Sequence, residues 1–406
     1  MNAELRTRDP GLGDLRPLRV AVFSNGYLPT INGVVNSIEA FRKGLDAAGH
    51  PVFIFAPAPY QPVDDPDFVF RFPSRSLGRC PDHPVALPFG RPRGHGSADP
   101  EVDVVHTQHP WWVGDWGLAF ARRHNVPAVT TIHTQYEQYA HYAWPVPPRL
   151  LRAITRRGVR RHCRRCEIVM TPGEAMKDYL EGLGVDRPVE VVPNATDLSG
   201  FDTADGAPIR AQYGVAPDDV LFTFIGRAAR EKNLDNLIRA FAMVAEELPA
   251  ARLIIVGGGP AFDSLRALAA AQPCAARIIL TGLIPYEQIR GYHAAADVFV
   301  TASITEVQPL SLSEAMAART PVAGIDAGGI NDMVKHGETG LLSPTNEGVE
   351  GLAGAMLELG RDAGKRQRMA EAAQRVSHRY DIPLATARLV DVYRRAIAGY
   401  AAGRSG

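Results

Sequence analysis

The sequence predicts an α/β protein of two domains, each a parallel β-sheet covered by helices on both faces. Short apolar runs bounded by turn residues alternate with segments of helical period, as in sheets of this kind. A second series of such runs repeats the plan of the first. The 406 residues also exceed the size at which a single hydrophobic core stops growing. We therefore expect two Rossmann-like domains whose parallel sheets face each other across a cleft.

The first half contains six short apolar runs that are predicted strands. The segment after the first of them has helical period and ends at Gly49, as helices often do at a glycine. We place this helix at 33–49. The strands are expected at residues 19–24, 52–56, 102–107, 128–133, 168–171 and 189–193.

A polar bridge at 202–217, containing Asp, Gly and Pro, separates these strands from a second series. The second series is expected at residues 220–225, 252–256, 277–281, 298–302 and 321–325. The chain then divides into a flexible N-terminus at 1–17, an N-terminal domain at 18–200, a C-terminal domain at 201–380 and a segment at 381–406. The helix of this last segment, 383–400, is open to packing back on the N-terminal domain.

The composition narrows the functional classes. Its 44 basic and 44 acidic residues balance, so the chain has no overall field that attracts nucleic acid, and we expect no such partner. No stretch reaches the roughly 18 consecutive apolar residues of a transmembrane helix, and the start of the chain is charged. We expect a cytoplasmic protein and leave open a peripheral attachment to the inner face of the cell membrane.

The cysteines indicate neither disulfides nor a metal. Four cysteines in so long a chain do not form a disulfide framework. Cys163 and Cys166 have the spacing of a redox or metal motif, but no second pair completes a zinc site. A structural role is the simpler interpretation, and we expect no metal.

The first strand is followed by a loop, YLPTINGV (27–34), that opens the predicted helix at Gly33. A glycine at this place lets backbone N–H groups and the helix dipole face a phosphate. The loop lacks the Gly-x-Gly-x-x-Gly fingerprint, which argues against an ordinary NAD site. Gly33 is therefore the candidate phosphate contact, and a plain turn is the alternative.

The corresponding place in the second series has the run GRAAREKN, which contains Gly226, Arg227 and Lys232. The two cations leave a strand end and enter a helix start, so they can bind a diphosphate without a metal ion. A solvated charged loop is the alternative. Three glycines at 257–259 follow the next strand. A base or ribose can lie against this turn at Gly258, although a purely structural turn explains it equally well.

Two glutamates flank the start of a helix predicted after strand 298–302. Glu306 lies in the loop before this helix, and Glu314 lies about one turn inside it. A carboxylate at the second place can accept both hydroxyls of a ribose, and Glu306 can face a sugar. Because this spacing is common by chance, the assignment depends on the neighbouring motifs.

A histidine ends the predicted strand at 128–133, in the run TTIHTQYEQYAHY. Ligands of open α/β sheets bind at the carboxyl ends of strands. We therefore expect His133 to donate to or accept from a sugar hydroxyl, opposite the motifs of the second series. A lone histidine is often structural, and that interpretation is the alternative.

Together these motifs resemble the retaining glycosyltransferases of family 4, which have the two-domain fold called GT-B. The resemblance covers residues 18–400, and its most specific part is the ordered set G-R-x3-E-K-N, G-G-G-P, E-x7-E-A-M-A and A-G-G. It implies a hexose donor in the form of a UDP- or GDP-sugar, which is a substrate, with no cofactor and no metal. It also implies that the anomeric configuration is retained, giving an α-glycoside.

The resemblance also implies a role for each residue. Stabilisation of the leaving diphosphate should contribute most to catalysis, and no carboxylate is obviously placed as a nucleophile. We therefore expect a front-face substitution in which the leaving phosphate takes the acceptor's proton. The implied contacts are Arg227 and Lys232 with the diphosphate, Glu314 with the ribose, Gly33 with the phosphate, His133 and Glu306 with the transferred sugar, and Val307, Gln308 and Leu310 through their backbone.

The loop at 306–310, called the sugar loop here because the resemblance implies that it contacts the transferred sugar, departs from the family pattern. The family usually has a glycine after Glu306, where this chain has Val307, and Pro309 cannot donate a backbone hydrogen bond. This departure leaves the identity of the sugar open.

Eight arginines lie between residues 149 and 165, in a segment whose remaining residues form a narrow strip of a helix. Near an anionic leaflet each cation can contribute on the order of 1 kcal/mol, so we expect a membrane surface as partner. A functionless basic helix is the alternative, and nucleic acid is disfavoured because aromatic residues are not interleaved. The residues assigned to acceptor and membrane are Tyr136, Arg152, Arg156, Arg157, Arg160, Arg161 and Arg164.

A resemblance to known enzymes also indicates the class of acceptor. The run from His133 to Tyr142 and the loop at 27–34 are similar to bacterial glycosyltransferases that act on diacylglycerol lipids, and part of the pattern resembles mannosyltransferases that extend glycolipids. This implies a lipid acceptor such as diacylglycerol or a glycolipid. Three alternatives stay open: a soluble small alcohol or sugar phosphate as acceptor, epimerisation of the donor, and nucleotide-sugar binding without catalysis. The oligomeric state is not predicted.

Overall fold

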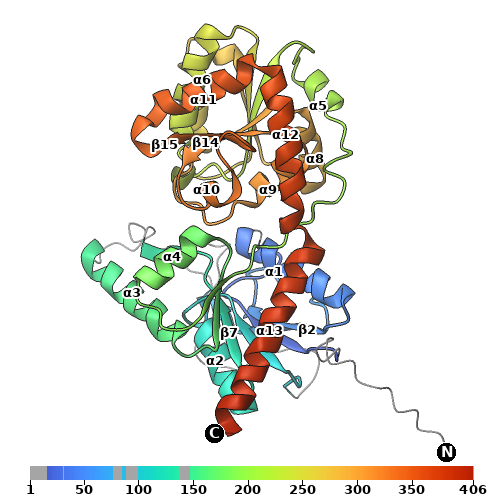
Figure 1. Ribbon diagram of the computed structural model, residues 1–406, viewed down its shortest axis with the longest axis vertical. Helices are drawn as coiled ribbons and strands as arrows, with labels where there is room; N and C mark the ends of the chain where they lie inside the picture. The colour runs from blue at the N-terminus through green and yellow to red at the C-terminus, as the bar shows by residue number, and fades with distance from the viewer. Residues whose placement is uncertain (1–15, 31, 76–84, 88–98, 138–146, 406) are drawn as a thin grey trace, which may run out of the picture.

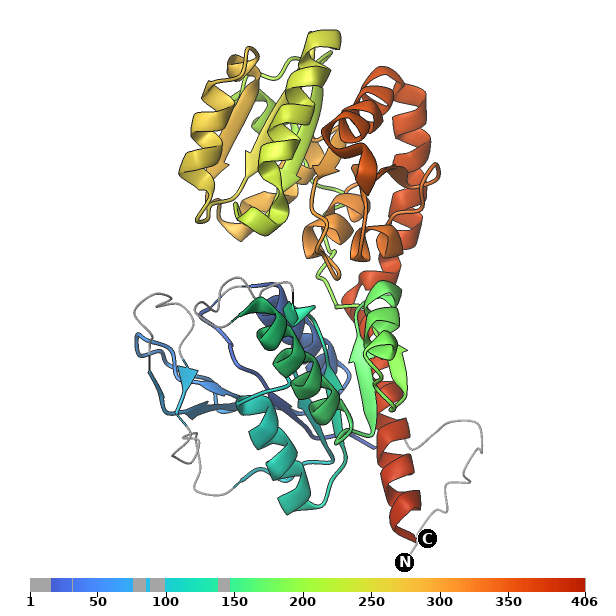
Figure 2. The same ribbon diagram turned by 90° about the vertical axis from the view of Figure 1, so that its left-hand side faces the viewer.

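The computed structural model of the chain describes residues 16–30, 32–75, 85–87, 99–137 and 147–405. It contains one parallel sheet in each half of the chain (Figure 1, Figure 2). Buried apolar side chains lie on both faces of each sheet. The predicted α/β class with two Rossmann-like domains is confirmed. None of the described helices is long and apolar enough to cross a membrane.

The sheet of the N-terminal half has seven parallel strands in the order β3-β2-β1-β6-β7-β8-β9. Its strands are buried along most of their length, as expected for a sheet covered on both faces. The strand order reverses its direction between β1 and β6. The strands are β1 (Val20–Phe23), β2 (Val52–Pro57), β3 (Val69–Phe72), β6 (Val104–Thr107), β7 (Ala128–Thr131), β8 (Ile168–Thr171) and β9 (Val189–Val191), and β4 (Ser74–Arg75) and β5 (Val85–Ala86) form a separate hairpin.

Local signals set the ends of the helices in this half. The side chain of Asn32 caps α1 by accepting a hydrogen bond from Val35 N at 3.0 Å. After α1 the chain turns at Gly49, whose φ of 79° suits a glycine. The described helices here are α1 (Gly33–Ala47), α2 (Val113–His124), α3 (Pro148–Cys163) and α4 (Glu174–Gly182).

The sheet of the C-terminal half has six parallel strands in the order β12-β11-β10-β13-β14-β15, and its order reverses between β10 and β13. The strands are β10 (Val220–Ile225), β11 (Ala251–Val256), β12 (Ile278–Gly282), β13 (Val298–Thr301), β14 (Val322–Asp326) and β15 (Gly340–Pro344).

Two helical layers enclose this second sheet. Apolar residues of α6, α7 and α11 pack on one face, and those of α8, α9 and α10 pack on the other. The helices are α5 (Ala207–Gln212), α6 (Leu234–Glu247), α7 (Phe262–Ala270), α8 (Tyr286–Ala295), α9 (Leu310–Ala317), α10 (Gly329–Met333), α11 (Gly348–Arg361) and α12 (Ala363–Ser377), with 3₁₀ turns at Arg230–Lys232, Ala275–Arg277, Thr345–Glu347 and His378–Tyr380.

The structure adds elements that the sequence pattern did not predict. The strand β3 was missed because Arg71 interrupts its apolar run, and the guanidinium is buried in an ion pair with Asp65 at 2.7 Å. The edge strand β15 was also missed, and α5 lies inside the expected polar bridge at 202–217. Of these additions, β3 and β15 extend the two sheets at their edges.

The long helix α13 (Ile382–Ser405) follows the C-terminal sheet in the chain and packs on the N-terminal one (Figure 1). Leu389, Val392 and Tyr393 join the apolar core formed by β1, β2 and α1. The approach of α1 to α13 is close, since a Cβ on Gly44 would lie 2.1 Å from Thr386 Oγ1. The N-terminal core therefore includes residues from both ends of the described chain.

Candidate functional site

The loops after β10 and β13 lie side by side where the C-terminal sheet reverses its order, the place at which open α/β sheets bind ligands. Lys232 and Glu306, one from each loop, form a partly buried ion pair. The side-chain amide of Asn233 donates to Ala302 O at 3.2 Å and joins the loops beside this pair. The structure thus brings together two predicted site residues from separate strand ends.

Arg227 lies at the start of the loop after β10 and is exposed. It forms no ion pair with any other residue in the described ranges. Gly226, just before it, donates from its N to Val256 O at 2.9 Å and continues the strand pairing. The guanidinium is therefore available for an anion on the same loop as Lys232.

The glycine turn at 257–259 packs against this loop. Gly257 and Gly259 have φ of 128° and 153°, and a Cβ on Gly257 would lie 2.0 Å from Gly226 O. Gly258 accepts at its O from Ala228 N at 2.9 Å. The close approach of the two loops explains these glycines without a ligand, so the donor contact at Gly258 stays a prediction.

Glu314 is inside α9, as predicted, and its carboxylate is 5% exposed. The Tyr286 hydroxyl donates to Glu314 Oε1 at 2.9 Å, and Nε2 of the fully buried His293 lies 3.4 Å from Oε2. Burial, followed by the neighbouring Glu314, raises the pKa of Tyr286, which stays a neutral donor. The carboxylate is thereby held in one orientation at the side of α9 that faces α8.

The sugar loop is fixed by two glycines that follow β14. Gly329 N donates to Glu306 O at 2.7 Å, and a Cβ on Gly329 would lie 1.7 Å from Val307 O. Pro309 precedes the first helical residue Leu310, and its missing N–H breaks no hydrogen bond of α9 because N-cap N–H groups have no partner within the helix. The departure at Pro309 therefore fits the helix start, and its effect on sugar contacts stays a prediction.

Loops at the carboxyl ends of the two sheets contact each other. Gln308 accepts from Asn194 N at 2.8 Å and donates to Asn194 O at 3.2 Å through its side chain. Asp332 accepts from Ala175 N at 3.0 Å, so a carboxylate of one half caps helix α4 of the other. Burial raises the pKa of Asp332. The side chain of Gln308, a predicted donor contact, thus acts between the two halves.

In the N-terminal half, Gly33 is the first residue of α1 and is exposed. A Cβ built on it would meet no atom within 4 Å. The glycine is therefore not required by packing, and open space beside the helix start is what a phosphate would need. The loop before it includes residue 31, which lies outside the described residues.

His133 follows β7 and is partly buried. Its Nε2 lies 2.7 Å from Gln108 Oε1, just beyond β6. Burial, followed by the neighbouring His109 and His106, lowers the pKa of His133 to about 3, so the ring is neutral near pH 7. The predicted sugar contact is held by a residue that the sequence pattern had not identified.

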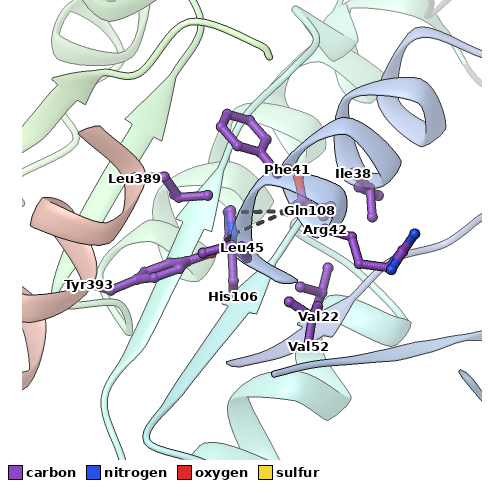
Figure 3. A pocket seen from close by; sticks show the side chains of 10 residues that line it. All are labelled: Val22, Ile38, Phe41, Arg42, Leu45, Val52, His106, Gln108, Leu389 and Tyr393. Atoms are coloured by element: carbon purple, nitrogen blue, oxygen red, sulfur yellow. Dashed lines mark hydrogen bonds between the residues drawn. The ribbon is translucent and has the colours of Figure 1, made fainter. Parts of the chain in front are cut away.

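A cavity of about 10 Å³ lies beneath this point, between the N-terminal sheet, α1 and α13 (Figure 3). It has room for about one water molecule, so it is not a site for a nucleotide or sugar. Its polar wall supports His133 through Gln108. The lining residues are Val22, Ile38, Phe41, Arg42, Leu45, Val52, His106, Gln108, Leu389 and Tyr393.

Helix α3 buries the strip with Thr155, Val159 and His162 and turns most of its arginines outward. Leu150 and Ile154, each 54% exposed, lie on the outward side with them. Three of the arginines are exposed and form no ion pair with any residue that the structure describes: Arg152, Arg157 and Arg161. Two others form ion pairs, Arg156 with Glu137 at 2.8 Å and Arg164 with Asp186 at 3.1 Å. Arg160 is half-buried.

Tyr136, the other predicted acceptor contact, packs against Trp111 with ring centroids 4.7 Å apart. The rest of the aromatic run that follows it, at 138–146, lies outside the described residues. At the C-terminal end of α3, Cys163 and Cys166 are buried thiols, and burial raises the pKa of Cys163 to about 12. Among the described residues no group of His, Cys, Asp or Glu is arranged to hold a metal ion.

Three residues of the site were missed by the sequence pattern. Gln108 directly follows β6 at the reversal point of the N-terminal sheet, and Tyr286 starts the helix after β12. Both positions lie just beyond a strand end, which is the signal that would have identified them. Asp332 has no such signal, because its partner Ala175 is 157 residues away in the chain.

Comparison with known proteins gives a match for each half. The family described as Glycosyltransferase Family 4 matches residues 31–199, and the family described as Glycosyl transferases group 1 matches residues 206–376. A GDP-mannose-dependent alpha-mannosyltransferase of Mycobacterium tuberculosis is 32% identical over 88% of this chain and 91% of that protein. An alpha-monoglucosyldiacylglycerol synthase of Acholeplasma laidlawii is 28% identical over 81% of this chain and 86% of that protein.

Among solved structures, the sucrose-phosphate synthase of Thermosynechococcus elongatus has a similar fold. It superposes with a TM-score of 0.73 at 20% identity and covers 95% of this chain and 100% of its own. At this level of identity the likeness concerns the fold alone.

Proposed function

This chain belongs to glycosyltransferase family 4, and on that premise we propose that it transfers a hexose from a UDP- or GDP-sugar to a membrane lipid such as diacylglycerol or a glycolipid. The family makes the chain a glycosyltransferase. The donor, the acceptor and the formation of an α-glycoside with retained configuration are the proposal.

The observation that carries the proposal is the pairing of Lys232 with Glu306 at the reversal point of the C-terminal sheet. Arg227 lies on the same loop without an ion pair to any described residue. Two cations at a strand end suit a diphosphate that no metal neutralises. The diphosphate would share Lys232 with Glu306, and Glu314 would accept the ribose hydroxyls.

The reaction follows from this distribution of charge. The bond between the anomeric carbon and the diphosphate oxygen breaks, and its electron pair stays on the diphosphate, where Arg227 and Lys232 stabilise it. The acceptor oxygen bonds to the same face of the sugar, and its proton passes to the leaving diphosphate. Glu306 is paired with a cation and serves as a sugar contact rather than as a nucleophile. A covalent glycosyl-enzyme trapped at Glu306 would contradict this step.

The outward side of α3 supports a lipid acceptor. Leu150 and Ile154 add apolar surface to the exposed Arg157 and Arg161 one and two turns further on. Such a helix lies on an anionic membrane with its apolar residues in the interface. The relative of Acholeplasma laidlawii is, by its name, a synthase of alpha-monoglucosyldiacylglycerol, which agrees with this assignment.

Release of nucleoside diphosphate from a panel of nucleotide sugars tests the proposal. We expect release from a UDP- or GDP-hexose that increases when anionic vesicles carrying diacylglycerol are present, together with a new glycolipid. Release that is equal with and without these vesicles, and that responds to a small alcohol or sugar phosphate, would replace the lipid by a soluble acceptor. No release from any donor would contradict catalysis itself.

A further inference from the structure

Gln108 is held rigidly at the reversal point of the N-terminal sheet. It directly follows β6 and is 4% exposed. Its N donates to Phe23 O at 2.9 Å, which continues the pairing of β6 with β1 beyond the strand end. A buried side chain on such a backbone has one orientation in which its amide is satisfied.

The contact of this amide with His133 defines a tautomer. His133 Nε2 lies 2.7 Å from Gln108 Oε1. An amide oxygen accepts and never donates, so Nε2 carries the proton. The ring is neutral, and its Nδ1 therefore has a free lone pair. Nδ1 makes no hydrogen bond to any residue in the described ranges. Because this nitrogen is not fully enclosed by protein, it is open to a ligand.

The other end of the amide is fixed by His106. Gln108 Nε2 lies 3.3 Å from His106 Nδ1 and 3.2 Å from His106 Nε2 (Figure 3). His106 is itself held by Thr131 Oγ1 at 2.7 Å and by the Tyr393 hydroxyl of α13 at 2.8 Å. A buried chain of contacts thus runs from α13 through His106 and Gln108 to His133.

We propose that Gln108 is a positioning residue that keeps His133 in the Nε2–H tautomer, so that Nδ1 accepts a hydrogen bond from a hydroxyl of the transferred sugar. This inference rests on the proposed role of His133 toward that sugar. It adds a direction to the contact: the sugar must donate. A donor sugar that lacks this hydroxyl, or has fluorine in its place, loses the contact.

The tautomer can be measured directly in the full chain. Long-range ¹H–¹⁵N spectra of protein labelled at histidine distinguish a protonated Nε2 from a protonated Nδ1, and the His133→Asn variant assigns the signal. We expect Nε2–H in the wild type and a mixture of tautomers in Gln108→Met. The control is Thr107→Val, which removes a hydrogen bond of 2.9 Å to the buried His162, outside this chain of contacts, and should leave the His133 signal unchanged.

Kinetics of the same variants give a second readout. We expect Gln108→Met to lower kcat/KM for the donor about 10- to 100-fold, as for the loss of one hydrogen bond that orients a reacting group. Gln108→Glu keeps an acceptor for Nε2–H and should restore most of this loss. Its carboxylate favours the imidazolium, so the activity should fall on acidification at a higher pH than in the wild type. The other titratable groups beside His133 are His106 and His109, and burial lowers the pKa of each.

The outcomes separate this inference from the proposed function. A wild-type His133 protonated at Nδ1, or a Gln108→Met variant that keeps the Nε2–H signal, overturns the positioning role whatever the activity. A lost Nε2–H signal with unchanged donor kinetics overturns the role of His133 toward the sugar. An active enzyme is expected in either case if the donor site of the C-terminal half is assigned correctly.

Discussion

At the scale of single residues, the proposed donor contact Glu314 is held in one orientation by its neighbours. Its carboxylate is almost completely buried between the Tyr286 hydroxyl and the ring of His293. A hydrogen bond to one oxygen fixes the orientation of a carboxylate. Ribose hydroxyls would therefore meet an acceptor that needs little rearrangement.

Replacing Glu314 by Gln keeps the shape of this group and removes its charge. Hydrogen bonds to a charged group contribute about 1.5–3 kcal/mol, so we expect the Kd for a nucleoside diphosphate to rise about 10- to 100-fold. Titration calorimetry with UDP and with GDP measures the change. The control is Glu287→Gln, an exposed site on α8 beside Tyr286, where Kd should stay within about twofold. Equal affinities of Glu314→Gln and the wild type would refute the ribose contact.

Residues at strand ends could be assigned from the sequence, and their partners could not. Lys232 and Glu306 follow apolar runs whose ends are visible in the pattern, and the structure places them in contact. Gln108 and Tyr286 also follow strands, but what they do depends on His133, 25 residues on, and Glu314, 28 residues on. Such pairings are set by the order of the strands in the sheet, which hydrophobic periodicity does not contain.

The strongest functional signal at the scale of elements is the outward side of α3. Thr155 and Val159 anchor the helix to the domain, and the opposite side combines apolar residues with arginines. An attachment of this kind weakens with salt, because exposed charges are screened, while the apolar part remains.

Reversal of two charges on this side tests the attachment. We expect Arg157→Glu with Arg161→Glu to lower the affinity for anionic vesicles at least about 30-fold at low salt, since each cation contributes on the order of 1 kcal/mol. Vesicle co-sedimentation measures this. The matched control is Arg239→Glu with Arg266→Glu, exposed sites on α6 and α7 with the same change in net charge. If both double variants sediment alike, α3 is not the attachment site.

Two strands that the sequence did not predict, β3 and β15, lie at the edges of their sheets. An edge strand pairs on one side alone, and β3 contains the charged Arg71 within its run. The central strands β1, β6, β10 and β13 were all predicted, because burial on both sides demands a continuous apolar run. The loops of the candidate site follow several of these central strands, among them β6, β10 and β13.

The two halves of the whole molecule differ in their buried histidines. Burial lowers the pKa of His106, His133 and His162 to about 3 and that of His109 to about 4, and all four lie in the N-terminal half. An unfolded histidine has a pKa of 6.5. Below that pH the unfolded state binds protons that the folded state does not bind. Their contribution to stability is therefore full above pH 6.5 and is lost as the pH falls toward the folded values.

We expect the free energy of unfolding of the N-terminal half to fall below pH 6.5 by about 1.4 kcal/mol per pH unit for each buried histidine. The four tryptophans, Trp111, Trp112, Trp116 and Trp144, all lie in this half, so their fluorescence follows its unfolding in urea. A urea midpoint that is the same at about pH 7.5 and at about pH 5 would contradict the prediction.

Two substitutions locate the origin of this pH dependence. His162→Gln replaces one buried histidine with a group that does not titrate and should make the dependence on pH shallower. His378→Gln changes an exposed histidine near the start of α13 and should leave the slope as it is. Equal slopes for both variants would place the acid sensitivity in other groups.

The position of helix α13 at the end of the chain has a consequence for folding during synthesis on the ribosome. The residues that complete the N-terminal core begin at 382, long after β9 ends at 191. At about 5–20 residues translated per second, the stretch between them takes roughly 10–40 s to make. During this time β1, β2 and α1 expose the apolar surface that Leu389 and Tyr393 later cover. The half that is made first is therefore completed last, and its apolar surface stays uncovered through about half of the synthesis of the chain.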